Sequence, residues 1–266
     1  MKIPIKTNNT IFFILKILVM PLKQELETQG NWLFRYRSFL PIIVLALGLG
    51  VFIQNVLLKN DNDCSLFFEM LCLAVSILGL IIRVYTVGFT PHNTSGRNTK
   101  AGQVADELNT TGIYSTTRNP LYLGNFFMWL GLAMFTENLW FVISFVFFYW
   151  VYYERIVFAE EQFLERKFGE QYTKWADKVP VFIPNLYLFR NTHLSFSLKK
   201  VLLKEKNGLF AMFLIFTVFE ITGEIILRHT HYNMIFIVGC ILTMILYIIL
   251  KVIKKRKTML QNKFSQ

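Results

Sequence analysis

Residues 112–124 read GIYSTTRNPLYLG, and this stretch marks the point where a polar loop turns into an apolar helix. Asparagine is favoured just before a helix, and proline is tolerated at the first helical position because its missing N–H would have no partner there. Asn119-Pro120 therefore predicts a helix start, and the apolar run 121–135 follows it directly.

The start of this helix is a candidate anion-binding site. A helix N-terminus carries unpaired N–H groups and a partial positive charge, so it can hold a carboxylate or a phosphate. Arg118 adds a full positive charge next to it. On these residues alone, a capped membrane helix whose arginine reaches lipid headgroups is an equally good interpretation.

Apolar runs of membrane-spanning length recur on both sides of this stretch. Of the 266 residues, 54% are hydrophobic and only 17% are charged, which is unlike a soluble domain or a disordered chain. Crossing a bilayer takes about 20 apolar residues in a helix, so the run 121–135 is short. We expect an all-α, polytopic membrane protein with about six transmembrane helices, over residues 39–58, 66–85, 121–135, 139–158, 209–227 and 234–253.

The distribution of charge predicts the orientation of these helices. With six spans both termini lie on one side, and all 28 Lys and Arg residues except Lys59 and Arg228 then fall on that side or at helix ends facing it. Basic loops stay in the cytosol, so we expect a multi-pass integral membrane protein with cytosolic N- and C-termini, in a bacterial inner membrane. Basic residues spread over separate loops favour membrane lipids over nucleic acid as the partner.

The sequence divides into five segments. We expect a cytosolic or interfacial segment over 1–38, with an interfacial helix at 11–20, and a transmembrane hairpin over 39–85. Polar sequence concentrates in 86–190, which we expect to be the functional core. A basic linker over 191–208 then leads to a C-terminal hairpin and basic tail over 209–266. The three cysteines have no metal-ligand spacing, so we expect no metal site.

A second polar stretch lies at 160–175 and reads EEQFLERKFGEQYTKW, followed by VPVFIP at 179–184. Its aromatic and leucine residues recur at helical spacing, which predicts an amphipathic helix. Glu160 and Glu161 fall where the fourth span leaves the bilayer, at a depth close to Asn119-Pro120. Carboxylates there would attract a cationic group, although a pair of glutamates at a helix end is commonly just solvated.

Together the two stretches resemble the isoprenylcysteine carboxyl methyltransferase-like membrane methyltransferases, which are related to the phospholipid N-methyltransferases. The family pattern is Gly-x-Tyr-(x)3-Arg-His-Pro-x-Tyr-x-Gly, then Glu-Glu-(x)2-Leu-(x)3-Phe-Gly-(x)2-Tyr, then a Val-Pro segment closed by Pro. Residues 80–190 follow it in order and spacing. The resemblance implies a helical-hairpin methyltransferase core, a cytosolic pocket for S-adenosylmethionine, and a lipid or lipid-like acceptor.

The resemblance also implies site residues. Carried over position by position, the cofactor contacts are Tyr114, Asn119, Pro120, Leu121, Tyr122 and Glu160, joined by Leu108 and Asn109 just upstream. We expect their charged neighbours Arg118 and Glu161 to be the catalytic residues. Arg97 and Arg155 are the expected contacts of the acceptor substrate.

Two positions depart from the family pattern. Asn119 stands where the family has histidine, which keeps hydrogen-bonding capacity but loses a titratable group. Ile156 stands one helical turn before Glu160, where the carboxyl methyltransferases carry an arginine for the acceptor. Arg155 is adjacent but points about 100° away around a helix. These departures argue against a prenylcysteine acceptor and leave methyl transfer itself in place.

Cationic residues suggest one identity for the acceptor. Arg83, Arg97, Lys100 and Arg118 could converge on a headgroup, and arginine suits bidentate recognition of phosphate. The acceptor would then be an anionic lipid headgroup, such as the lipid A phosphate that some bacterial members of the family methylate. Contact of these residues with the cofactor or the membrane surface explains them equally well.

Three other readings of the chain stay open. Methylation of a prenylcysteine carboxyl or a phospholipid amine would keep the chemistry and change the acceptor. A sterol-reductase-like NADPH oxidoreductase shares a similar C-terminal architecture. A non-enzymatic transporter is motivated by Glu220 and Glu224, which lie on one face of the fifth span. The absence of Gly-x-Gly-x-x-Gly after a strand argues against a Rossmann-type enzyme.

Overall fold

The computed structural model describes residues 21–37, 39–59, 66–91, 97–99, 102–228 and 232–263. The expected interfacial helix at 11–20 lies outside these ranges. Within them the chain is helical almost throughout, which confirms the all-α prediction. The helices are α2 (Leu22–Tyr36), α3 (Leu40–Lys59), α4 (Leu66–Gly88), α5 (Pro120–Met134), α6 (Leu139–Phe168), α7 (Glu170–Ala176), α8 (Leu198–Leu227) and α9 (Met234–Lys263).

Short elements complete the fold. The strands β1 (Arg97–Thr99) and β2 (Gly102–Val104) pair as an antiparallel hairpin between α4 and α5. Two 3-10 turns, η1 (Ile113–Ser115) and η2 (Leu186–Leu188), lie in the connections before α5 and after α7. The β-hairpin was not predicted, and its two strands are the only ones in the described part of the chain.

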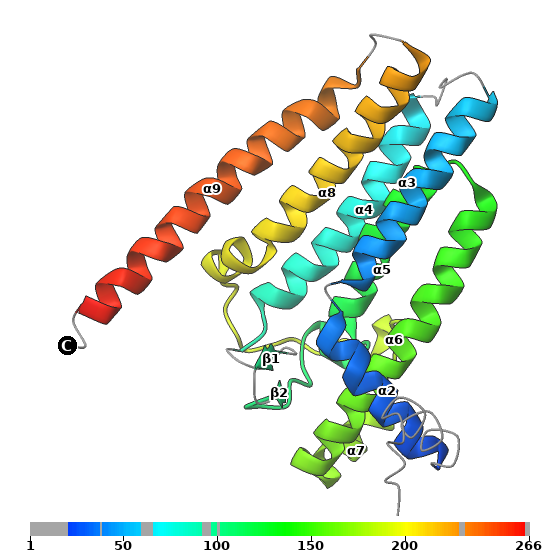
Figure 1. Ribbon diagram of the computed structural model, residues 1–266. Helices are drawn as coiled ribbons and strands as arrows, with labels where there is room; N and C mark the ends of the chain where they lie inside the picture. Colours follow the sequence, from blue (N-terminus) through cyan, green and yellow to red (C-terminus); the bar gives the residue numbers. More distant parts are fainter. Residues whose placement is uncertain are drawn as a thin grey trace, which may run out of the picture.

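Five of the described helices are long and apolar enough to cross a membrane: α3, α4, α6, α8 and α9. The sixth expected span is α5, which has 15 residues and a length of about 22 Å, less than the ~30 Å of a bilayer core. It lies within the bundle, between α4 and α6 (Figure 1). The five long helices and the short α5 therefore correspond to the six expected spans.

The helix α8 begins earlier than the sequence predicted. It starts at Leu198 rather than at residue 209, and the Ser197 hydroxyl caps it by accepting a hydrogen bond from the Lys200 N–H. Part of the expected basic linker is therefore helical. Lysine is a good helix former, so a basic stretch that the charge pattern marks as a linker can continue a helix.

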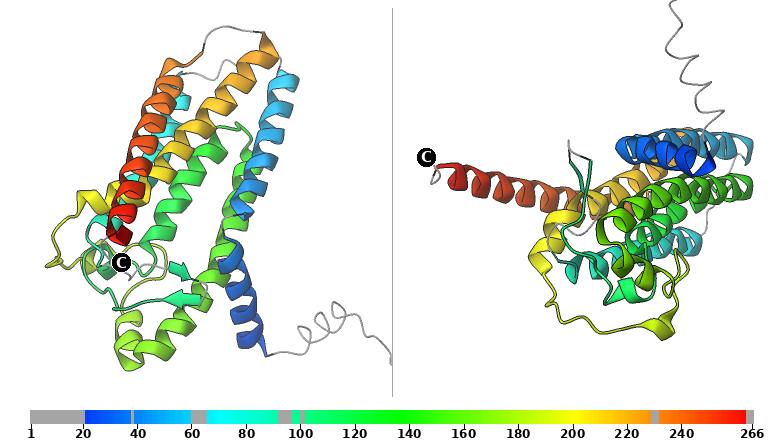
Figure 2. Two further views of the ribbon diagram at one scale, coloured as in Figure 1. Left: turned by 60° about the vertical axis from the view of Figure 1, so that its left-hand side comes forward. Right: turned by 90° about the horizontal axis from the view of Figure 1, so that it is seen from below.

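The long helices run side by side, and the two ends of the bundle differ (Figure 1). The helices α2 and α7 lie at one end, together with β1 and β2, and the connection between α8 and α9 lies at the opposite end. In Figure 2 the helix α9 packs along α8 and leans away from the other helices. Most of its apolar side chains are exposed on the outside of the bundle.

Small residues let α4 and α5 approach closely. A Cβ added to Gly79 would lie 2.4 Å from the Gly124 carbonyl oxygen, and one added to Gly131 would lie 2.3 Å from the Cys72 carbonyl oxygen. Small residues at such contacts are typical of helices that pack within membranes. The α4–α5 pair is thereby fixed as the centre of the bundle.

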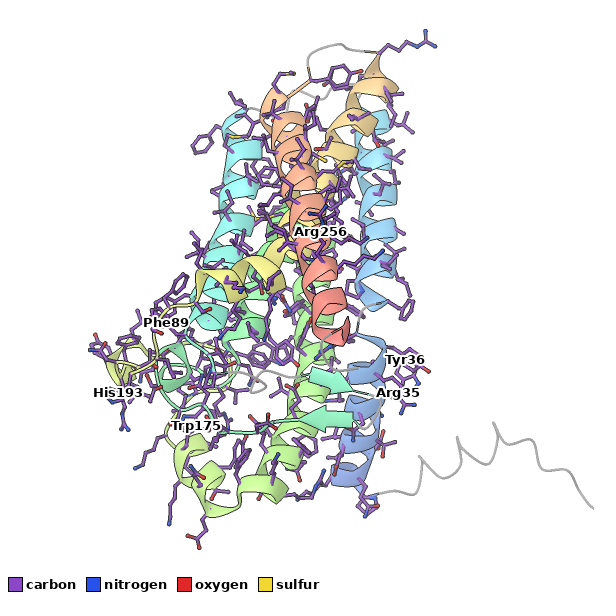
Figure 3. All side chains as sticks on the ribbon, turned by 90° about the vertical axis from the view of Figure 1, so that its left-hand side faces the viewer. Arg35, Tyr36, Phe89, Trp175, His193 and Arg256 are labelled. Atoms are coloured by element: carbon purple, nitrogen blue, oxygen red, sulfur yellow. The ribbon has the colours of Figure 1, made fainter. Side chains whose placement is uncertain are left out.

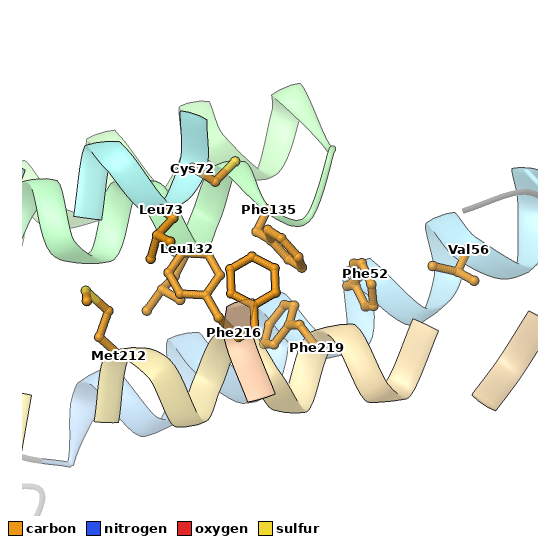
Figure 4. Packing of buried hydrophobic residues seen from close by; sticks show 10 residues of the cluster. Phe52, Val56, Cys72, Leu73, Leu132, Phe135, Met212, Phe216 and Phe219 are labelled. Carbon is orange, nitrogen blue, oxygen red and sulfur yellow. The ribbon is translucent and has the colours of Figure 1, made fainter. Parts of the chain in front are cut away.

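Two apolar clusters hold the remaining helices. The first joins α3, α4, α5, α8 and α9, and at its middle the rings of Phe216 and Phe236 stack at 5.2 Å (Figure 4). The second joins α2, α5 and α6 and is rich in tyrosine, including Tyr149 and Tyr153. Both clusters contribute to the site described next, the first through Leu132 and Met212 and the second through Tyr122 and Tyr153.

Candidate functional site

A cavity of about 580 Å³ lies among α2, α4, α5, α6 and α8, within the usual size range of small-molecule sites. Part of its wall is polar and charged, and part is apolar. Among the lining residues are Tyr114, Arg118, Asn119, Pro120, Leu121, Tyr122 and Glu160. The two polar stretches singled out in the sequence therefore meet at one cavity.

The loop before α5 is held by the segment that follows α7. The Arg118 N–H donates to the Pro180 carbonyl at 2.8 Å, and the Thr117 hydroxyl donates to the Val181 and Phe182 carbonyls at 3.1 Å. The Asn185 N–H donates back to the Thr116 carbonyl at 2.9 Å. The strap, as we call residues 179–190, thus fixes the backbone that carries Arg118 and Asn119.

Asn119 precedes α5 as predicted, but its side chain does not cap the helix. Its amide donates to the Val181 carbonyl at 3.2 Å, and no N–H of the helix donates to its side chain. Its backbone carbonyl accepts from the Tyr122 and Leu123 N–H groups at 3.1 Å each. The Asn119 side chain is hydrogen-bonded to the strap and does not cap the helix. Asn119 therefore shapes the cavity by holding the strap in place.

Glu160 reaches the cavity from the C-terminal part of α6. With 30 residues, α6 is about 45 Å long, so its last turns extend past a bilayer core of about 30 Å. The Tyr122 hydroxyl is a hydrogen-bond partner of the Glu160 carboxylate, and the Tyr122 ring lies 4.6 Å from that of Tyr153. Desolvation and the nearby Glu160 charge raise the pKa of the Tyr114 phenol. The cavity therefore places the Glu160 carboxylate beside neutral aromatic hydroxyls.

Arg118 and Glu161 lie together at the edge of the cavity. Arg118 Nε is 3.3 Å from Glu161 Oε1, and both side chains are largely buried. Arg118 lines the cavity, whereas Glu161 contacts Arg118 and is not part of the cavity wall. The structure thus brings the two residues expected to be catalytic into one ion pair, in which the charge of Arg118 is matched.

Among the predicted site residues whose side chains the structure describes, Leu108, Asn109, Arg155 and Glu161 are not part of the cavity wall. Leu108 and Asn109 lie outside it, and the Asn109 side chain accepts from the Thr111 N–H within its own loop. Arg155, expected to contact the acceptor, also lies outside the cavity wall and pairs with Glu154 at 2.8 Å. Arg97 lies in β1, and its side chain is outside the described part of the chain.

Several cavity residues were not assigned to the site from the sequence, apart from the suggestion that Arg83 contacts a headgroup. Arg83 makes two contacts to Glu205, at 2.7 and 2.8 Å, and donates to the Asn125 amide oxygen at 2.5 Å. Arg37 reaches the cavity from the end of α2. From α8, Glu205, Gly208, Met212 and Ile215 line the cavity, and their spacing in the sequence is that of one helix face. This spacing was overlooked because the basic residues around Glu205 indicated a linker.

Glu220 and Glu224 lie at the other end of the bundle, away from the cavity. Glu220 accepts from the Asn233 N–H at 2.7 Å, and the Asn233 amide donates to Glu69 at 2.5 Å. Glu224 is buried close to them. Among the described residues, no group of three or more His, Cys, Asp or Glu side chains is arranged to hold a metal ion.

Comparison with known proteins identifies the central part of the chain. The phospholipid methyltransferase family model matches residues 68–171, from α4 to the start of α7. Three similar proteins are a nickel-cobalt-cadmium resistance protein of Alcaligenes xylosoxydans and the protein-S-isoprenylcysteine O-methyltransferases of Saccharomyces cerevisiae and Schizosaccharomyces pombe. They are 35%, 31% and 37% identical to this chain over 91, 119 and 78 residues.

The matched segments cover only part of this chain and only part of each relative. They cover 34%, 43% and 29% of this chain, and 42%, 49% and 33% of the three relatives, so the chain spans less than half the length of each. No solved structure matches the chain. The helices α2, α3, α8 and α9 lie outside the matched domain. Residues 68–171 are therefore similar to the phospholipid methyltransferase family and to the isoprenylcysteine O-methyltransferases of the two yeasts.

Proposed function

We propose that this protein is an integral membrane methyltransferase that uses S-adenosylmethionine to methylate a lipid or lipid-like acceptor. The observation that carries this proposal is the meeting of the two sequence stretches at one cavity. Six of the eight residues that the family resemblance assigns to the cofactor line it: Tyr114, Asn119, Pro120, Leu121, Tyr122 and Glu160.

The chemistry of the cavity fits this methyl donor. S-adenosylmethionine supplies a methyl group on a positively charged sulfur, together with an amino acid moiety and an adenine. Glu160 offers a negative charge for a cationic group, and the rings of Tyr114 and Tyr122 offer surfaces on which an adenine can pack. The tasks left to the chain are to align the acceptor and to exclude water, which need neither a nucleophilic side chain nor a metal.

The apolar part of the wall supports a lipid-like acceptor. Met128, Trp129 and Leu132 of α5 face Met212 and Ile215 of α8 across it. This surface continues from the charged end of the cavity into the membrane-spanning part of the bundle. An acceptor with a polar group at the charged end and a hydrocarbon chain along this surface would bury apolar area at both partners.

The cavity also bears on the identity of the acceptor group. An anionic headgroup such as a lipid A phosphate remains our finer proposal, and its support is narrow because Glu205 and Glu161 already match the charges of Arg83 and Arg118. Prenylcysteine carboxyl methylation has the yeast relatives in its favour. However, Ile156 is fully buried among apolar residues, where that reaction would need an arginine. Methylation of a phospholipid amine is the third option.

We further propose that the cavity faces the cytosol. The end of the bundle with α2 and α7 carries nearly all the basic residues, and such segments stay on the cytosolic side. The termini would then be cytosolic and the protein would lie in a bacterial inner membrane. A pocket on that side would draw its methyl donor from the cytosol.

Mass spectrometry of lipids tests the proposed reaction. Cells with and without the protein are grown on methyl-labelled methionine, and their total lipids are compared. We expect a labelled lipid only with the wild-type protein. The variant Glu160→Gln keeps the size of the side chain and removes its charge, and losing a partner of a buried cationic group costs roughly 30-fold or more in activity. Glu165→Gln, an exposed position on the same helix, is the control and should label normally.

Two results would contradict parts of the proposal. If no lipid carries the label but the purified protein binds S-adenosylhomocysteine, the acceptor is a small molecule or a protein. If the protein binds no such ligand, methyl transfer is wrong, and reduction by NADPH or transport of a solute becomes the better hypothesis.

A further inference from the structure

The helix α2 lies outside the matched methyltransferase domain and packs tightly on α6. A Cβ added to Gly30 would lie 2.0 Å from the Arg155 carbonyl oxygen and 2.7 Å from the Ala159 Cβ, so only glycine fits at this contact. Phe34 is buried in the same interface, and Glu27 pairs with Arg166 of α6 at 2.7 Å. The last turn of α2 is therefore held in place beside the part of α6 that carries Glu160.

This docking brings one charged side chain to the cavity. Arg37 follows the last residue of α2 and lines the cavity, and its guanidinium carbon lies 4.2 Å from the centre of the Phe34 ring. Its neighbours Arg35 and Tyr36 are exposed and project from the outer side of α2 (Figure 3). Of these three consecutive residues, Arg37 alone is directed inward.

Arg37 and Glu160 carry opposite charges, and both line the cavity. The positive charge of Arg37 acts electrostatically on the Glu160 carboxylate. Arg83 and Arg118, two other cations of the wall, are already paired with Glu205 and Glu161. Lys204 also lines the cavity, but it comes from α8 and its side chain is exposed. Arg37 and Glu160 are therefore both in reach of a ligand bound in the cavity.

A ligand with a positive and a negative group on one carbon complements this pair. We infer that Arg37 binds the carboxylate of the amino acid moiety of the methyl donor, while Glu160 binds the ammonium group of the same moiety. The planar guanidinium matches a carboxylate through two parallel hydrogen bonds. The inference rests on the proposed function and adds to it a binding residue from outside the matched domain.

Binding measurements on two ligands test this inference without relying on activity. The full-length protein, purified in lipid nanodiscs, is titrated with S-adenosylhomocysteine and with its decarboxylated analogue, which lacks only the carboxylate. Arg37→Gln should weaken binding of S-adenosylhomocysteine by about tenfold or more, the effect of losing one charged hydrogen-bonded contact. Binding of the decarboxylated analogue should stay within about twofold, because the analogue cannot use Arg37. Arg35→Gln, the same change on the outer side of the same helix, should alter neither affinity.

A second variant tests the role of α2 while keeping Arg37. Gly30→Ala forces α2 away from α6, and we expect the same selective loss of affinity for S-adenosylhomocysteine. Gly50→Ala is its control, since a Cβ there meets nothing within 4 Å. A normal melting temperature for Arg37→Gln would show that the protein is still folded.

Three outcomes would overturn the inference. Equal losses for both ligands would mean that Arg37 supports the cavity without touching the carboxylate. Unchanged ligand affinity in Arg37→Gln, with a raised KM for the lipid acceptor, would assign Arg37 to an anionic group of the acceptor. Unchanged affinity and unchanged KM would leave Arg37 without a ligand. Failure of the wild-type protein to bind S-adenosylhomocysteine would instead overturn the proposed function itself, so the two failures are distinguishable.

Discussion

Buried glutamates lie at both ends of the helix bundle, but their partners differ. At the cavity end, Glu205 pairs with Arg83 and Glu161 pairs with Arg118. At the opposite end, Glu69 and Glu220 receive hydrogen bonds from a single asparagine, Asn233, at the start of α9. One end of the bundle matches charge with charge, and the other satisfies carboxyl oxygens with amide groups.

This difference separates a binding site from a structural junction. Charged pairs in a cavity wall fix the positions of arginines that face a ligand, and they join α4 with α8 and the α5 loop with α6. The bonds of Asn233 join α9 to α8 and α4 where the last two helices connect. We therefore expect changes at the cavity end to affect both stability and ligand binding, and changes at the other end to affect stability alone.

The largest effect is expected at Glu205. Removing one partner of a buried ion pair leaves the other charge unmatched, so Glu205→Ala should lower the free energy of unfolding by about 3–5 kcal/mol. The double variant Arg83→Met with Glu205→Leu should recover much of this loss, since it removes both charges and keeps the volume. Reversible unfolding in detergent measures the stability, and titration with S-adenosylhomocysteine measures the binding.

The double variant also checks the comparison. If it is no more stable than Glu205→Ala alone, the pair does not act as a unit, and α8 is held to the domain by its apolar contacts only. A double variant that regains stability but not ligand affinity would show that the pair serves the cavity as well as the fold.

A smaller effect is expected at Asn233. Asn233→Ala removes the hydrogen bond from the Asn233 side-chain amide to Glu69, and it removes the oxygen that accepts from the Ile235 N–H at the start of α9. We expect the free energy of unfolding to fall by about 1–3 kcal/mol. The backbone bond to Glu220 remains. Affinity for S-adenosylhomocysteine should be unchanged. A loss of affinity similar to that in Glu205→Ala would mean that the two ends of the bundle are coupled and that the comparison is wrong.

Much of the fold was predictable because lipid imposes a simple rule on sequence. Each spanning helix needs a long apolar run, and such runs located both ends of α3 and α4 within a few residues. They also located the starts of α6 and α9, although each of these helices runs 10 residues past its predicted end. The rule failed at the start of α8, where Lys199, Lys200 and Lys204 continue the helix beyond the apolar run. Charge marks where a helix leaves the membrane, and it does not mark where the helix ends.

The candidate site was predictable only in part, for a different reason. Tyr114, Asn119, Tyr122 and Glu160 belong to two compact motifs, so local sequence pointed to them. The partner of Arg83 lies 122 residues further along the chain, and no local pattern connects the two. Arg37 depends on the contact between Gly30 and α6, which exists only once α2 has docked. Residues that join distant helices cannot be predicted from one motif.

The smallest effect is expected at the strap, and a threonine at the other end of the bundle provides its control. The Thr117 hydroxyl donates to two strap carbonyls, whereas the Thr222 hydroxyl donates to the Val218 carbonyl of its own helix at 2.6 Å. Both can be changed to valine with little change in volume. Thr117→Val should lower the free energy of unfolding by about 0.5–1.5 kcal/mol and raise the Kd for S-adenosylhomocysteine a few-fold, since the loop bearing Arg118 and Asn119 loses an anchor. Thr222→Val should change neither quantity, and equal changes in the two variants would mean that the strap has no special part in holding the site.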